Sequence, residues 1–122
     1  MKRTKIICLL GLLLFLLSTG LSAHQDSGND LLTWWKAYQR FKNADSIHRP
    51  TSNTYYQAGM FDGFVLGALN ALRQHDIDFP SSVTYGQIYS IVGKYLEDHP
   101  EELHLNAFKL VRSALSVFPP QK

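Results

Sequence analysis

The N-terminal segment most constrains what this chain can fold into, because it has to be set apart before the rest is interpreted. Lys2, Arg3 and Lys5 precede an apolar run of 12 residues, 6–17, and small, weakly polar residues follow up to Ala23. This order is typical of a cleaved secretory signal peptide, and a membrane-spanning helix would need about 20 apolar residues. We therefore predict a signal peptide over residues 1–23 and one exported domain over residues 24–122.

The residues around the predicted cleavage site argue against a lipid anchor. Residues 21–24 are similar to a lipoprotein cleavage box, but His24 stands where the lipid-modified cysteine would be needed. Cys8 lies inside the apolar run and cannot serve in its place. We expect an exported protein with no stable membrane anchor.

Removal of the predicted signal peptide changes both the charge and the cysteine content. The whole chain has 12 Lys and Arg against 10 Asp and Glu, but three of the basic residues belong to the signal peptide. The exported part keeps 9 basic and 10 acidic residues, a net charge of −1, and no basic stripe that would favour nucleic acid as a partner. It has no cysteine, so packing or oligomerisation has to stabilise it in place of disulfides.

The spacing of apolar residues in the exported part predicts an all-α fold, a small helical bundle of about four helices. We expect the first helix to begin at Asn29 or Asp30, the second to cover about 53–73, the third to follow Thr84 and end at Pro100, and the fourth to cover about 105–117. Thr84 and Gln87 have the spacing of a capping box at the start of the third helix.

The second predicted helix has an unusual composition. Gly59, Gly63 and Gly67 fall at positions i, i+4 and i+8, and each costs about 1 kcal/mol relative to alanine in a helix. We expect this cost to be offset by helix packing, in which another helix approaches the glycines very closely. Asp62 lies between them and has two interpretations: an exposed carboxylate on the outer face, or a buried partner for a donor on another helix.

No residue pattern in the exported part points to catalysis, a metal or a cofactor. It has no cysteine nucleophile, and no serine lies in a G-x-S-x-G elbow. His99 and His104 are separated by Pro100, which spoils a ligand pair on one helix face. We therefore predict no catalytic, metal-binding or cofactor-binding residues, and a protein that is not an enzyme.

An ordered set of motifs covers most of residues 29–120. It consists of Tyr56–Gly63, Pro80–Gln87, Val92–Ala107 and Ala114–Pro119, preceded by Asn29–Leu32. Together these motifs resemble the Rap/Tai immunity proteins of type VI secretion systems. The resemblance implies an exported all-helical protein that binds a peptidoglycan amidase toxin in the periplasm and blocks its active-site cleft, and it also implies a homodimer. Many members have cysteines near the positions of Asp78 and Pro120, which this chain lacks.

The turn at residues 98–104 is a candidate for the blocking element, because it is polar and lies between two predicted helices. The hypothesis assigns four partner contacts: His99, Glu101, Glu102 and His104. The other interpretation is that His99 and Pro100 simply end the third helix. An alternative function is that of a periplasmic acid-stress chaperone, or of another envelope binding protein, and a chaperone should expose apolar surface.

Overall fold

The computed structural model describes residues 25–121. It contains four α-helices and one short 3-10 helix in the order α2 (Gly28–Lys42), α3 (Ser52–His75), α4 (Tyr85–Asp98), η1 (Pro100–Glu102) and α5 (Ala107–Leu115). No strand occurs within residues 25–121, which confirms the all-α prediction. The predicted signal peptide lies outside the described residues.

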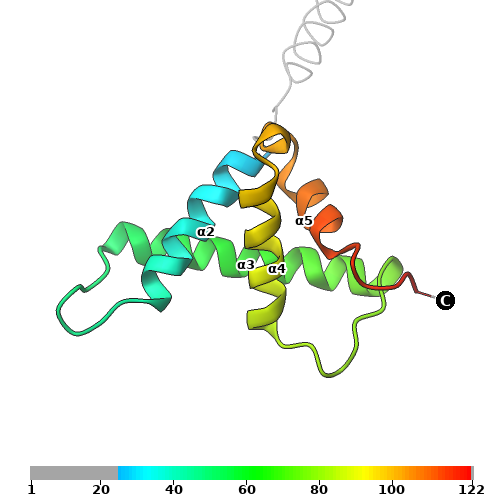
Figure 1. Cartoon of the computed structure of the whole chain (residues 1–122), viewed down its shortest axis with the longest axis horizontal. Helices are drawn as coiled ribbons and strands as arrows, with labels where there is room; N and C mark the ends of the chain where they lie inside the picture. The colour runs from blue at the N-terminus through cyan, green and yellow to red at the C-terminus, as the bar shows by residue number, and fades with distance from the viewer. Residues whose placement is uncertain (1–24, 122) are drawn as a thin grey trace, which may run out of the picture.

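The long helix α3 extends across the whole molecule, and α2 and α4 cross it (Figure 1). The start of α2 and the connection between α4 and α5 lie together at one end. Backbone contacts join them, because Gly28 N donates to Leu105 O (2.9 Å) and Ala107 N donates to Asp26 O (2.9 Å). The C-terminal segment returns to the end of α3, where Asp78 N donates to Pro119 O (2.9 Å).

Local capping explains where the helices begin. Thr84 and Gln87 form the predicted capping box of α4: Gln87 N donates to Thr84 Oγ1 (3.3 Å), and Thr84 N donates to Gln87 Oε1 (2.8 Å). The first helix begins slightly earlier than predicted, because Ser27 is its N-cap and Asp30 occupies the third helical position of a second capping box. Asn106 caps α5, so that helix begins at Ala107 and not at Leu105.

An aromatic cluster lies where α2, α3 and α4 meet. Trp35 and Tyr38 from α2 contact Phe61 from α3, with ring centroids 5.2 and 5.5 Å apart. Tyr89 from α4 packs edge-on against Tyr38 and Phe61 at 5.4 and 5.8 Å. Such tilted and edge-to-face pairs add to the stabilisation that comes from burial itself. The cluster therefore sets how the three helices cross.

The predicted packing role of Gly59, Gly63 and Gly67 is wrong for the described chain. A Cβ added at any of the three would meet no other atom within 4 Å, and all three lie on the exposed side of α3. The face of α3 that packs inward is formed instead by larger residues: Phe61, Val65, Ala68, Leu69 and Leu72.

Two other glycines occupy the close contacts. A Cβ at Gly28 would lie 2.8 Å from Leu103 Cα, and a Cβ at Gly93 would come closer than 3.0 Å to three ring atoms of Trp35. Backbone and a buried ring approach these positions because no side chain intervenes. Neither glycine was singled out from the sequence, since neither belongs to a repeat.

Candidate partner-binding site

The connection between α4 and α5 carries the four side chains that were predicted to contact a partner. Its centre is anchored by Leu103, which is 8% exposed. Leu103 O accepts hydrogen bonds from Asn29 N (3.0 Å) and Asn29 Nδ2 (3.2 Å). The turn is therefore tied to the start of α2 as well as to α4 and α5, and its backbone is held in place.

Two of the four side chains, His99 and Glu102, are engaged with Tyr95 on the last turn of α4. The His99 ring stacks on the Tyr95 ring at a centroid distance of 4.0 Å, and His99 Nδ1 lies 2.9 Å from Tyr95 O. Tyr95 Oη donates to Glu102 Oε2 (2.7 Å). This hydrogen bond is the main reason why the pKa of Tyr95 is raised. His99 and Glu102 are thus half-buried and stabilise the turn itself.

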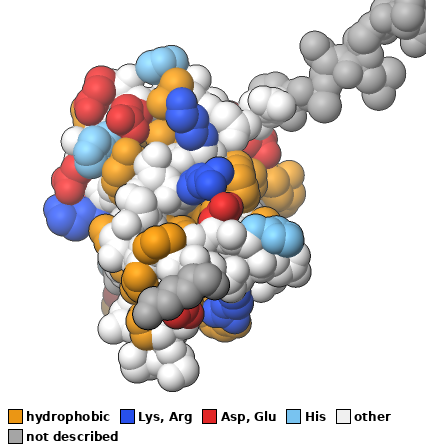
Figure 2. Space-filling view, turned by 90° about the vertical axis from the view of Figure 1, so that its right-hand side faces the viewer, with side chains coloured by type: hydrophobic (Ala, Val, Ile, Leu, Met, Phe, Trp, Pro, Cys, Tyr) orange, Lys and Arg blue, Asp and Glu red, His pale blue; other side chains and the backbone are white. Residues whose placement is uncertain are grey.

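The other two side chains, Glu101 and His104, are exposed. His104 Nδ1 lies 2.9 Å from Glu101 O, which holds the imidazole over the turn. Acidic and histidine side chains gather at the upper left of the face in Figure 2, the end of the molecule at which the α4–α5 connection lies in Figure 1. The structure therefore brings all four predicted residues into one turn but leaves only two of them free to meet a partner.

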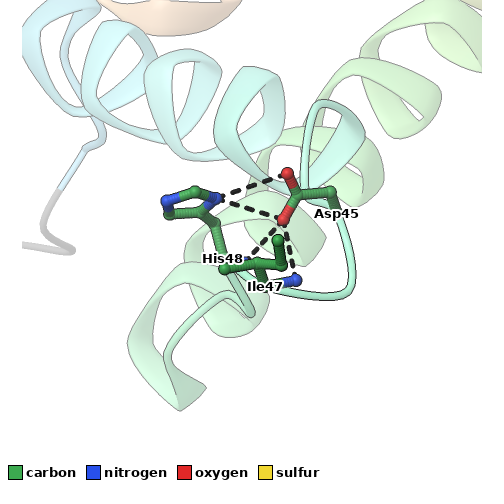
Figure 3. Close-up of polar contacts among 3 residues, drawn as sticks. All are labelled: Asp45, Ile47 and His48. Atoms are coloured by element: carbon green, nitrogen blue, oxygen red, sulfur yellow. Dashed lines mark hydrogen bonds and ion pairs between the residues drawn. The ribbon is translucent and has the colours of Figure 1, made fainter.

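The loop between α2 and α3 is arranged around one carboxylate. Asp45 Oδ1 accepts from the backbone N–H groups of Ile47 (2.9 Å) and His48 (2.6 Å), and the His48 ring lies 3.1 Å away (Figure 3). The backbone hydrogen bond from His48 is the largest cause of a lowered pKa for Asp45.

A groove of about 710 Å³ lies beside this loop. Its lining includes Lys36, Arg40 and Arg49, and none of these cations takes part in an ion pair within residues 25–121. The loop lies at the end of α2 that is far from the α4–α5 turn in Figure 1. The carboxylates of the turn and the cations of the groove therefore mark two distinct polar surfaces.

Asp62 is half-buried, and it accepts a short hydrogen bond from Tyr89 Oη on α4. The hydrogen bond agrees with the second of its two interpretations, a partner for a donor on another helix, but Asp62 is not fully buried as that interpretation expected. Burial, and then the hydrogen bond to Asp62, raise the pKa of Tyr89. Burial also raises the pKa of Tyr38, with a smaller contribution from the Asp62 charge. Asp62 also lines a concavity of about 400 Å³ between α2 and α3.

The described residues contain no further feature that indicates chemistry. Within residues 25–121, no group of three or more His, Cys, Asp and Glu side chains could hold a metal ion. In the same range every buried side-chain nitrogen or oxygen has a hydrogen-bond partner. None of the helices in this part of the chain is long and apolar enough to cross a membrane.

Comparison with known proteins adds one finding. Residues 27–119 match the family model of the Rap1a immunity proteins, a range that includes all four helices and the α4–α5 turn. No curated protein and no solved structure matches the chain.

Proposed function

The chain belongs to the Rap1a immunity protein family, and from that premise we propose that it protects a cell by binding and blocking a peptidoglycan amidase delivered by a type VI secretion system. Membership of the family indicates a protein that acts against a secreted toxin. The amidase target, the secretion system and the periplasmic location are the further steps of this proposal.

The family match over residues 27–119 is the observation that carries the proposal. Two features agree with it. The first 23 residues have the order of a secretory signal peptide, which would deliver the protein to the compartment where a cell-wall amidase acts. The α4–α5 turn presents the exposed side chains of Glu101 and His104, and its backbone accepts three hydrogen bonds from the start of α2, two at Leu103 O and one at Leu105 O. Such a rigid polar turn suits insertion into a cleft.

A protection assay tests the location and the target together. Cells that produce the amidase in their periplasm should survive when they also produce the full chain. They should lyse when the chain lacks residues 2–23, because the inhibitor then stays in the cytoplasm. The purified exported protein should also block hydrolysis of peptidoglycan by the amidase. Equal protection with and without residues 2–23 would contradict the periplasmic location, and unimpaired hydrolysis would contradict the inhibitor role.

The assignment of the turn is tested by single substitutions. Glu101→Ala and His104→Ala remove exposed side chains and should weaken amidase binding by roughly tenfold each if these side chains lie near the centre of the interface. His75→Ala, on an exposed histidine at the end of α3, is the matched control and should not change affinity. His99→Ala and Glu102→Ala are less informative, because they also break the contacts with Tyr95. Wild-type affinity in both Glu101→Ala and His104→Ala would remove the turn from the interface.

We also propose that the immunity protein forms a homodimer. Light scattering of the purified exported protein should then give twice the mass of one chain.

If the protein binds no amidase but prevents aggregation of unfolded proteins at low pH, the chaperone alternative is correct and the immunity proposal is wrong.

A further inference from the structure

The concavity between α2 and α3 has the composition of a pocket for a charged side chain. Its lining includes three aromatic rings, Tyr38, Phe41 and Tyr55, together with Gly59, Asp62 and Lys42. Its volume is about 400 Å³, enough for one long side chain. It is separate from the α4–α5 turn, which contributes no residue to its lining.

Asp62 supplies the negative charge of this pocket. Its Oδ1 accepts from Tyr89 Oη, whereas Oδ2 has no hydrogen bond or ion pair with any described residue. Lys42 is part of the same lining but forms no ion pair with Asp62. A half-buried carboxylate with one oxygen unpaired favours a cationic donor, because charge-assisted hydrogen bonds are about twice as strong as neutral ones.

The aromatic rings at the pocket rim favour a planar cation. Phe41 and Tyr55 lie with ring centroids 5.5 Å apart and an interplanar angle of 64°. They are 41% and 52% exposed, so a ligand in the pocket can reach both rings. The face of an aromatic ring attracts a cation, and a guanidinium group can stack on a ring while its N–H groups donate to a carboxylate.

Gly59 keeps the pocket open. A Cβ at this position would meet nothing within 4 Å, so the space above the α3 backbone is available to a ligand. We propose that the pocket receives an arginine side chain of the partner toxin, with the guanidinium donating to Asp62 and stacking on the exposed rings. This inference rests on the proposed function, since it names a second contact of the same complex.

The chain's own arginines give limited scope for a second copy to fill the pocket. Arg112 pairs with Asp76 (3.0 Å), and the Arg73 guanidinium lies 5.8 Å from the centroid of the Phe79 ring. Among the arginines of residues 25–121, Arg40 and Arg49 are without such contacts, and both lie in the groove beside the α2–α3 loop. The oligomeric state of the pocket variants decides this alternative.

Two variants of the full exported protein impair the pocket in different ways. Asp62→Asn removes the charge but keeps an oxygen that can accept from Tyr89, and Gly59→Leu fills the open space. Asp62→Asn should lower affinity for the amidase about 10-fold to 100-fold, the effect of truncating one partner of a partly buried charge pair. Gly59→Leu should also lower it, because the leucine side chain excludes the arginine from the pocket. Lys42→Gln should raise affinity a few-fold, because it removes a like charge from the lining.

Gly67→Leu is the matched control for Gly59→Leu. It lies on the same exposed side of α3, where a Cβ also meets nothing within 4 Å, but it does not line the pocket. Its affinity should stay within about twofold of wild type, as expected for a surface substitution. Both leucine variants should melt at or above the wild-type temperature, because leucine is a better helix former than glycine.

A double-mutant cycle identifies the arginine. Each exposed arginine of the amidase is replaced by alanine and measured against wild-type protein and Asp62→Asn. For the arginine that enters the pocket, the combined loss should fall short of the product of the single losses by about fivefold or more. For every other arginine, the loss of affinity in the double mutant should equal the product of the two single losses.

The outcomes separate the two proposals. If wild type binds the amidase and both Asp62→Asn and Gly59→Leu bind equally well, or if no arginine couples to Asp62, the pocket inference is wrong and the immunity function stands. If the variants change the oligomeric mass but not the amidase affinity, a second copy fills the pocket and the inference is also wrong. If wild type binds no amidase, the proposed function fails and this inference fails with it.

Discussion

Substituting Gly93 in α4 tests the packing of the core most directly. An alanine Cβ there would come closer than 3.0 Å to three ring atoms of Trp35. Trp35 is only 7% exposed and packs against Phe61, and its Nε1 donates to Glu97 Oε1 (2.8 Å). The ring therefore has little room to move away, and a shift would also strain its hydrogen bond.

The expected change in stability is the balance of three contributions. Overpacking of a core costs about 1–3 kcal/mol, and strain on the bond from Trp35 to Glu97 costs about 1 kcal/mol more. Alanine regains about 1 kcal/mol through its higher helix propensity. Gly93→Ala should therefore lower the free energy of unfolding by about 2 kcal/mol, which corresponds to a fall in Tm of about 10 °C for a domain of this size.

Gly63→Ala is the matched comparison, because it makes the same chemical change on an exposed face. A Cβ at Gly63 meets nothing within 4 Å, so only the helix propensity changes and the protein should gain about 1 kcal/mol. Urea unfolding followed by tryptophan fluorescence and circular dichroism measures both variants. Wild-type stability of Gly93→Ala would refute the Trp35 contact. A loss of stability in Gly63→Ala would show that another chain covers this face of α3 in solution.

Three further predictions address the turn, a helix cap and a tyrosine. Gly28→Ala should lower the free energy of unfolding by about 2 kcal/mol, because its Cβ would lie 2.8 Å from Leu103 Cα and a backbone atom can move away less easily than a side chain. Amide hydrogen exchange should become faster in residues 100–105, and unchanged exchange would contradict the contact. Thr84→Ala should lower the free energy of unfolding by about 1 kcal/mol through loss of the capping box, with Thr84→Ser restoring most of it, and urea midpoints that do not differ would argue against the cap. The pKa of the Tyr89 hydroxyl is raised in the folded protein, so as the pH rises the unfolded chain loses the hydroxyl proton before the folded protein does. The contribution of Tyr89 to stability should therefore be complete below about pH 10 and should decrease as the pH rises further. Urea unfolding between about pH 8 and 11 should show a weaker decline for Tyr89→Phe, and an identical decline would assign the effect to other groups.

Features that depend on neighbours in the chain were predictable. The capping box of Thr84 and Gln87 needs only two residues three positions apart, and the structure contains it. The start of α2 was misplaced because Ser27, Asn29 and Asp30 are all good capping residues within four positions. Asp30 still contributes to the cap, but from inside the first turn. The error is one of position and not of element type.

Features of the candidate sites were less predictable, because they depend on contacts between helices. The four polar residues of the α4–α5 turn lie within six consecutive positions, so their proximity was expected. The sequence did not indicate that Tyr95 would engage His99 and Glu102 and leave Glu101 and His104 exposed. The hydrogen bond that Asp62 accepts likewise comes from Tyr89, which lies 27 residues away on another helix.

The glycines show which features the sequence determines and which depend on contacts between distant parts of the chain. Periodicity and capping act over three or four residues, so the sequence alone was enough to establish four helices and to show that Gly59, Gly63 and Gly67 share one face of α3. Whether anything covers that face depends on where residues far along the chain come to lie. Only the tertiary structure could show that this face is open, and that Gly28 and Gly93 are the positions where backbone and a buried ring leave no room for a side chain.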